Sequence, residues 1–233
     1  HKTKYSSEYV FGTPEGLKLA VNALYALQRY YANDTENATI FALERGTDLA
    51  VTNGGTGNFY GIYDPNYLKP SASQVGFMWR TMYQIIGKAN EIIAAAEDLE
   101  DTPSLRATVS EAKCFRAQSY FLLYRTFDRI WLNIQPTTAE NVNDPRDFHA
   151  ASEKAVFDLI YEDLEYAIRN LDWVSDEAGR FTRAAARHMK ATAALWLKDW
   201  DTTLEQVEEI EKSGHFDLIA LNEVFNAGDL NHK

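Results

Sequence analysis

Apolar side chains recur with a helical period along most of this chain, which is organised around the stretch from Glu111 to Trp131. One face of this stretch carries Ala112, Phe115, Ser119, Leu122 and Thr126, and a second face carries Ala117, Tyr120, Phe121, Tyr124 and Phe127. A helix with two apolar faces must lie between neighbours rather than on a surface. The positions expected to face solvent are Lys113, Gln118 and Arg125. The pattern predicts a central helix, ended by Trp131, in an all-α domain.

The same period predicts helices before and after this stretch. Their ranges are about 14–31, 73–99, 152–171, 183–198 and 199–212, and the central helix starts near Pro103. Thr13, Ser152 and Thr182 are residue types that cap helix starts. Gly214 follows the last helix, where a glycine tolerates left-handed backbone geometry.

An internal repeat relates the two halves of this helical pattern. A shift of 74 residues places Ala112-Lys113 on Ala186-Arg187 and Phe115-Arg116-Ala117 on Met189-Lys190-Ala191. Helices 73–99 and 104–127 therefore correspond to helices 152–171 and 182–198. Stacked antiparallel hairpins are the architecture of tetratricopeptide-like repeats. The predicted fold is an α-α superhelix of such hairpins with long irregular loops.

The segment 33–73 has no helical period and reads as an irregular insertion in the helical domain. Its amides and aromatics cluster, and the candidate ligand contacts are Asn53, Asn58, Tyr60, Tyr63, Asp64 and Tyr67. Tyrosine rings can stack on the apolar faces of sugars, and the amide and carboxylate groups can hydrogen-bond to sugar hydroxyls. Alternatively, the tyrosines pin a long loop to the core while their hydroxyls reach water.

Composition narrows the class of protein. The 233 residues suffice for a single domain spanning residues 1–233, and the net charge of −11 argues against nucleic-acid binding. No apolar run reaches 18 residues, so no transmembrane segment is expected. Cys114 is the one cysteine, which excludes a disulfide framework. The chain begins at His1 rather than Met, so we expect a mature or trimmed form.

Few residues suggest chemistry. Arg116 and Asp163 both fall on faces expected to be buried, so a structural ion pair between them, or between Arg116 and Glu111, is predicted. The tryptophans expected to pack are Trp79, Trp173, Trp196 and Trp200. The five histidines lack zinc-ligand spacing and no GxSxG sequence occurs, so we expect no metal, cofactor or catalytic residue.

Five segments follow one another in the order of a known sequence pattern. They are Trp79 with Tyr83, Ile86, Ala89-Asn90 and Ile93; Glu111 to Ala117; Ile160, Asp163-Leu164 and Ala167; Gly179-Arg180, Thr182 and Ala185-Ala186; and Trp200-Asp201 with Ser213-Gly214, Phe216 and Leu218. Together these segments resemble the SusD/RagB family. The chain departs from the family at Asp128 to Trp131, where members carry Gly-Asp-Val-Pro. Members are also longer, so the resemblance implies an N-terminal helical portion.

The resemblance implies a function that the residues alone do not. Family members are lipid-anchored on the outer face of the outer membrane in Bacteroidetes, and the anchoring cysteine is absent from this chain. They bind oligosaccharides or polysaccharides and deliver them to a SusC-like TonB-dependent transporter. Two other hypotheses stay open. One is a helical docking module without its own glycan site, and the other is a helical enzyme such as a glycoside hydrolase with two carboxylates facing one cleft.

Overall fold

A computed structural model of the chain describes residues 6–33, 73–138, 140–145 and 148–218. These residues form α1 (Ser7–Gly12), α2 (Pro14–Asn33), α4 (Ser73–Ala96), α5 (Pro103–Phe127), α6 (Glu153–Asn170), α7 (Arg183–Leu197) and α8 (Trp200–Lys212). Outside the helices, the only strand-like pairing in the described part is an isolated bridge between Trp131 and Ala150. The prediction of an all-α fold is confirmed.

Local chemistry sets the helix starts, as the sequence indicates. The Thr13 hydroxyl accepts a hydrogen bond from the Gly16 amide at 3.1 Å. Ser152 and Thr182 cap α6 and α7 in the same way. Gly214 ends α8 with a φ of 69°. The short helix α1 was not predicted, because six residues are too few to show a 3.6-residue period.

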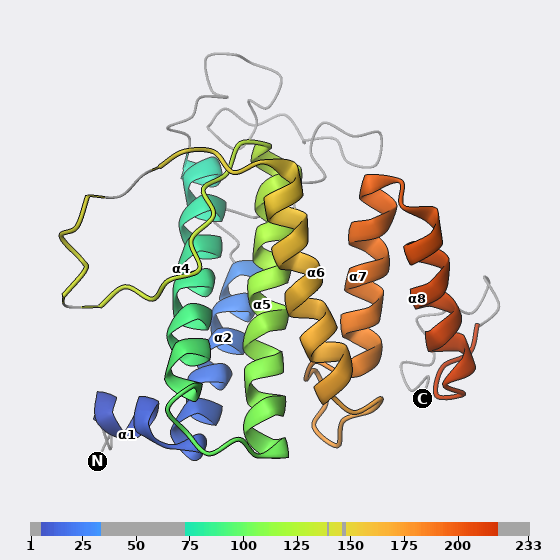
Figure 1. Ribbon diagram of the computed structural model, residues 1–233, viewed down its shortest axis with the longest axis horizontal. Helices are drawn as coiled ribbons and strands as arrows, with labels where there is room; N and C mark the ends of the chain where they lie inside the picture. The colour runs from blue at the N-terminus through green and yellow to red at the C-terminus, as the bar shows by residue number, and fades with distance from the viewer. Residues whose placement is uncertain (1–5, 34–72, 139, 146–147, 219–233) are drawn as a thin grey trace.

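The helices stack as a single row of hairpins. Figure 1 shows α4, α5, α6, α7 and α8 side by side in chain order, with α2 behind α4 and α5. Helix α5 contacts α2, α4, α6 and α7, so both of its apolar faces have partners. The predicted central helix is confirmed.

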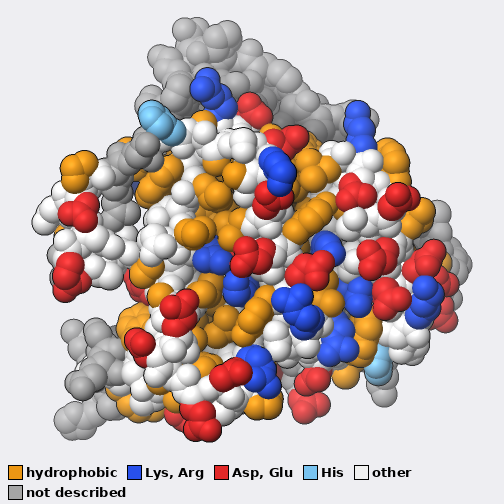
Figure 2. Space-filling view, viewed as in Figure 1, with side chains coloured by type: hydrophobic (Ala, Val, Ile, Leu, Met, Phe, Trp, Pro, Cys, Tyr) orange, Lys and Arg blue, Asp and Glu red, His pale blue; other side chains and the backbone are white. Residues whose placement is uncertain are grey.

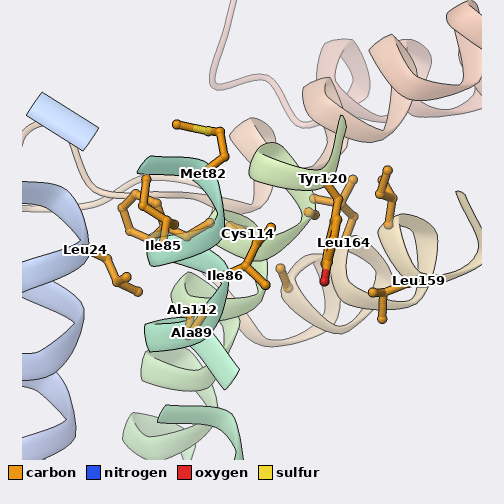
Figure 3. Packing of buried hydrophobic residues seen from close by; sticks show 14 of the residues in the cluster. Leu24, Met82, Ile85, Ile86, Ala89, Ala112, Cys114, Tyr120, Leu159 and Leu164 are labelled. Atoms are coloured by element: carbon orange, nitrogen blue, oxygen red, sulfur yellow. The ribbon is translucent and has the colours of Figure 1, made fainter. Parts of the chain in front are cut away.

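The core runs through this row of helices. In Figure 3, Leu24 of α2, Ile86 of α4 and Leu164 of α6 follow one another across it, and each is at most 1% exposed. Cys114 of α5 lies in the same cluster with no exposed surface. On the outside, Figure 2 shows acidic and basic side chains interspersed over one face. No helix among the described residues is long and apolar enough to cross a membrane.

Equivalent polar contacts accompany the 74-residue repeat. The Lys113 ammonium of α5 donates to Asp163 of α6, and Arg187, which is shifted by 74 residues, donates from α7 to Gln206 of α8. Both acceptors are buried. A buried polar contact thus joins α8 to α7, as another joins α6 to α5, although only the donors Lys113 and Arg187 are related by the 74-residue shift.

Three predictions about single residues are wrong. The central helix ends at Phe127 rather than Trp131, because Asp128 turns the backbone with a φ of 60°. Lys113 is 9% exposed rather than solvated, since α6 supplies a carboxylate for its ammonium. Trp196 of α7 and Trp200 of α8, both expected to pack, are 48% and 57% exposed because nothing in the described part of the chain covers those faces.

Candidate functional site

The six candidate ligand contacts lie in the segment 34–72, outside the described residues. They are Asn53, Asn58, Tyr60, Tyr63, Asp64 and Tyr67. Their role therefore stays a prediction. Possible sites among the described residues are two polar networks, two grooves and one row of aromatic rings.

The first polar network joins α4, α5 and α6. The structure brings Arg116 and Asp163 together: Arg116 Nε lies 2.7 Å from Asp163 Oδ2, and Arg116 Nη2 lies 2.8 Å from Asp163 Oδ1. The remaining guanidinium nitrogen, Nη1, donates to Asn90 Oδ1 at 2.8 Å. The Asn90 amide nitrogen in turn donates to the Asn133 carbonyl at 2.9 Å. The two parallel hydrogen bonds from Arg116 to Asp163 make this a bidentate contact, which is among the strong forms of an arginine–carboxylate pair.

Lys113 completes the network, although the sequence pattern had indicated that this lysine faces solvent. Its ammonium nitrogen lies 2.7 Å from Asp163 Oδ1 and 5.3 Å from the centre of the Tyr166 ring. The Asp163 side chain has no exposed surface, so no ligand can reach it. The network therefore holds helices together and is not a binding site.

The second network joins α2, α5 and the α6–α7 connection. The Tyr25 hydroxyl donates to Glu111 Oε2 and accepts from the Phe181 amide at 2.7 Å. Arg180 Nε lies 3.4 Å from Glu111 Oε2, and its guanidinium lies 4.9 Å from the centre of the Tyr25 ring. Glu111 thus pairs with Arg180 and Tyr25, not with Arg116 as the alternative prediction had it.

Burial dominates the titration of this second network. It raises the pKa of the Glu111 carboxyl, although the Tyr25 hydrogen bond and the Arg180 charge act in the opposite direction. Burial, together with the hydrogen bond to Glu111, also raises the pKa of the Tyr25 hydroxyl well above its usual range. The tyrosine therefore stays a neutral donor at physiological pH.

A polar groove of about 470 Å³ opens beside Glu111. It is lined by α2, α5 and the α6–α7 connection, and includes Lys18, Thr108, Asp172 and Glu177. Arg180 Nε lies 3.4 Å from Glu111 Oε2 and 3.5 Å from Glu177 Oε2, so the guanidinium bridges the two carboxylates. The single positive charge of Arg180 is thus shared between two carboxylates, and its guanidinium lies beside one oxygen of each.

A row of three aromatic rings leads from α4 to the surface. It joins Tyr83 of α4 to Trp131 and Phe148 in the connection between α5 and α6. The Trp131 ring lies 6.2 Å from Tyr83 and 5.0 Å from Phe148, and Phe148 is 70% exposed. The Tyr83 hydroxyl donates to the Trp131 carbonyl at 2.7 Å and accepts from the Trp131 amide at 2.9 Å. These two bonds fix the backbone that carries the Trp131 indole.

A second groove, of about 270 Å³ and mostly apolar, lies between α5 and α7. Its polar lining comes from Gln28, Gln118, Arg125, His188 and Thr192. This groove could not be predicted from the sequence, because the lining residues are spread over α2, α4, α5, α6 and α7. Only the spacing of Phe121 and Arg125, four residues apart on one helix, was visible in advance.

Metal and thiol chemistry find no support in the described residues. That part of the chain holds no group of three or more His, Cys, Asp or Glu residues placed to bind a metal ion. Burial raises the pKa of the Cys114 thiol well above its usual value, so the nucleophilic thiolate is disfavoured.

Known proteins are similar to this chain in sequence and in fold. No family model matches the sequence. The chain is 28% identical over 223 residues to the SusD-like protein P2 of Formosa agariphila, covering 91% of this chain and 42% of that protein. A SusD superfamily protein of known structure from Bacteroides vulgatus superposes with a TM-score of 0.76, at 16% identity over 90% of this chain and 46% of that one. In sequence and in fold, the chain is similar to SusD-like proteins.

One SusD-like structure in the comparison is described as laminarin-binding. It is 25% identical to this chain, with a TM-score of 0.71 over 83% of this chain and 42% of that one. The chain thus spans less than half the length of these SusD-like proteins.

The SusD-like motifs of this chain meet in the two polar networks. Asn90, Arg116 and Asp163 come from three different motifs and form the first network. Glu111 and Arg180 come from two motifs and form part of the second. These five motif residues therefore hold the helices together.

Proposed function

We propose that this chain is part of a non-enzymatic cell-surface protein that binds an oligosaccharide or polysaccharide. The observation that carries the proposal is its likeness to the laminarin-binding SusD-like protein. A structure with a xylogluco-oligosaccharide, 21% identical to this chain, has a similar fold, with a TM-score of 0.72. The two structures with different glycans support the class of ligand in this proposal and leave the particular glycan open.

The proposed glycan contacts are the tyrosines Tyr60, Tyr63 and Tyr67, with Asn53, Asn58 and Asp64 as hydrogen-bonding partners. The argument for them is chemical: flat rings offer stacking surface at low cost in conformational entropy, and amides and carboxylates match sugar hydroxyls. The two buried polar networks strengthen the argument by removing the other signature residues from consideration.

The proposed partner is a SusC-like TonB-dependent transporter, to which the protein would deliver the bound glycan. The proposed location is the outer face of the cell outer membrane, with attachment through a lipid anchor. Both proposals rest on the family.

An enzymatic function is disfavoured by the polar groove. A glycoside hydrolase needs one carboxyl free to give a proton and another free to act as base or nucleophile. Here Arg180 bridges Glu111 and Glu177, and Tyr25 already donates to Glu111. The second candidate function is a docking module without its own glycan site, which the exposed apolar side chains of α8, Trp200, Leu204 and Val207, favour.

Affinity gel electrophoresis with laminarin, xyloglucan and a panel of other polysaccharides tests the proposal. We expect at least one polysaccharide to retard the parent protein, and the triple variant Tyr60→Ala/Tyr63→Ala/Tyr67→Ala to lose most of that retardation. Trp200→Ala is the control, because it removes an exposed aromatic from α8. A full-length protein that no polysaccharide retards would favour the docking module, and release of reducing sugar would favour an enzyme.

A further inference from the structure

The apolar groove between α5 and α7 has the features of a small binding site. Its floor is made by Met82, Ile160 and Leu164, each 1% exposed, and the accessible lining is partly polar. At about 270 Å³, its volume lies just below the range of roughly 300–1,000 Å³ that is typical of small-molecule pockets. A ligand of one or two sugar residues is therefore the appropriate size.

Arg125 is the only arginine or lysine lining this groove, and two aromatic rings hold it in place. Its guanidinium carbon lies 5.2 Å from the centre of the Phe121 ring and 5.5 Å from that of Trp196. The two rings are nearly perpendicular, at 89°, so they contact the guanidinium from two directions. Such contacts orient the planar guanidinium before any ligand arrives.

Arg125 has no acidic partner among the described residues. Several arginines elsewhere in the described chain do have one: Arg106 pairs with Asp101, Arg169 with Glu165, and Arg187 with Glu209. In a chain of net charge −11, acidic groups are plentiful, yet none in the described part lies within 4 Å of Arg125. Its hydrogen-bond donors are left available to an external acceptor.

The chemistry of this lining fits an acidic sugar. A guanidinium binds a carboxylate or a sulfate through two parallel hydrogen bonds, which a neutral hydroxyl cannot accept in the same way. Phe121 and Leu122 offer an apolar surface to the C–H face of a pyranose ring, and Gln118 and Thr192 can bond its hydroxyls.

We infer that the α5–α7 groove binds an anionic saccharide residue, with the acidic group of the sugar on Arg125. The inference rests on the proposed glycan-binding function and deepens it by naming the charge of the ligand. It also places a second contact region at a distance in sequence from Tyr60, Tyr63 and Tyr67.

Isothermal titration of the full-length protein with three probes tests this inference: polygalacturonate, dextran sulfate and neutral laminarin. We expect the parent to bind at least one of the two polyanions, and the preferred one reveals whether the acidic group is a carboxylate or a sulfate. Arg125→Gln should weaken that binding at least tenfold. Arg125→Lys should recover only part of it, since lysine keeps the charge but loses the two-pronged geometry.

Arg80→Gln is the matched control, because it removes one positive charge from an exposed position of α4 that does not line the groove. It should change polyanion binding less than twofold. Equal losses in Arg125→Gln and Arg80→Gln would reveal a general charge effect and overturn the inference, as would unchanged binding in Arg125→Gln. Binding of laminarin alone would overturn it while leaving the glycan-binding function intact, and binding of no glycan by the full panel would remove both.

Discussion

Replacing Asp163 with alanine is the most direct test of what holds this fold together. Asp163 is the only carboxylate in contact with the buried cations Lys113 and Arg116 among the described residues. All three side chains are at most 11% exposed. In Asp163→Ala, two positive charges would remain in the interior. Their contacts given above would then be the side-chain oxygen Oδ1 of Asn90, for Arg116, and the Tyr166 ring, for Lys113.

The expected destabilisation is large for a single substitution. Removing one partner of a buried ion pair costs about 3–5 kcal/mol, chiefly because the other charge is left uncompensated. For a chain of this size, each kcal/mol lowers Tm by about 2–4 °C. The melting temperature should therefore fall by roughly 6–20 °C.

Thermal melts and urea titrations monitored by circular dichroism would measure the effect. Asp158→Ala is the control, since Asp158 pairs with Lys154 on the exposed face of α6, and its Tm should change by no more than about 2 °C. The triple variant Lys113→Met/Arg116→Met/Asp163→Leu should be more stable than Asp163→Ala, because no buried charge remains unpaired. A Tm for Asp163→Ala within a degree of the parent would refute the reasoning.

Three further predictions concern single residues. Burial raises the pKa of Glu111 in the folded protein, so its stabilising effect is fully present below the pKa of the unfolded chain and is lost as pH rises through the folded value. The Tm of Glu111→Gln minus that of the parent should therefore increase from pH 4 to pH 7. A constant difference would contradict this prediction. Tyr83→Phe removes both hydrogen bonds to the Trp131 backbone and should cost about 1–3 kcal/mol in urea unfolding, whereas an unchanged midpoint would show that water replaces them. Cys114 has no exposed surface, so a thiol reagent should label it in 6 M guanidinium but not in the native protein, and rapid native labelling would show that α5 opens easily.

The helices and their caps could be predicted because the information is local. An apolar period of 3.6 residues and a hydroxyl at the N-cap are properties of one segment, and Ser152 and Thr182 act in the structure as their sequence context indicates. The 74-residue repeat likewise identified the hairpins, since equivalent helices bury equivalent positions.

The surroundings of individual side chains could not be predicted in the same way. Lys113 looked solvated because a lysine on one helix gives no information about a carboxylate 50 residues later on another. Trp196 and Trp200 looked like packing residues, yet they are 48% and 57% exposed. Hydrophobicity alone does not reveal whether a neighbouring element covers a given face of a helix.

The candidate site was predicted only as a class of chemistry. The tyrosine-rich segment stood out because its composition has no helical explanation, and its contacts remain a prediction. The α5–α7 groove and the setting of Arg125 depend on how five helices converge, which no single stretch of sequence encodes.

The contact between α2 and the α6–α7 connection has a consequence for how the chain folds during synthesis. Arg180 Nη1 donates to Asn22 Oδ1 across 158 residues, and the Phe181 amide donates to the Tyr25 hydroxyl across 156. Most other helix contacts join neighbours in the chain, which favours rapid local assembly as the polypeptide leaves the ribosome. Helix α2 can dock on α4 early, but Asn22 and Tyr25 cannot make their hydrogen bonds to Arg180 and Phe181 until those residues have been synthesised. The first hairpins should thus form as a loose intermediate that becomes rigid only once this distant connection arrives.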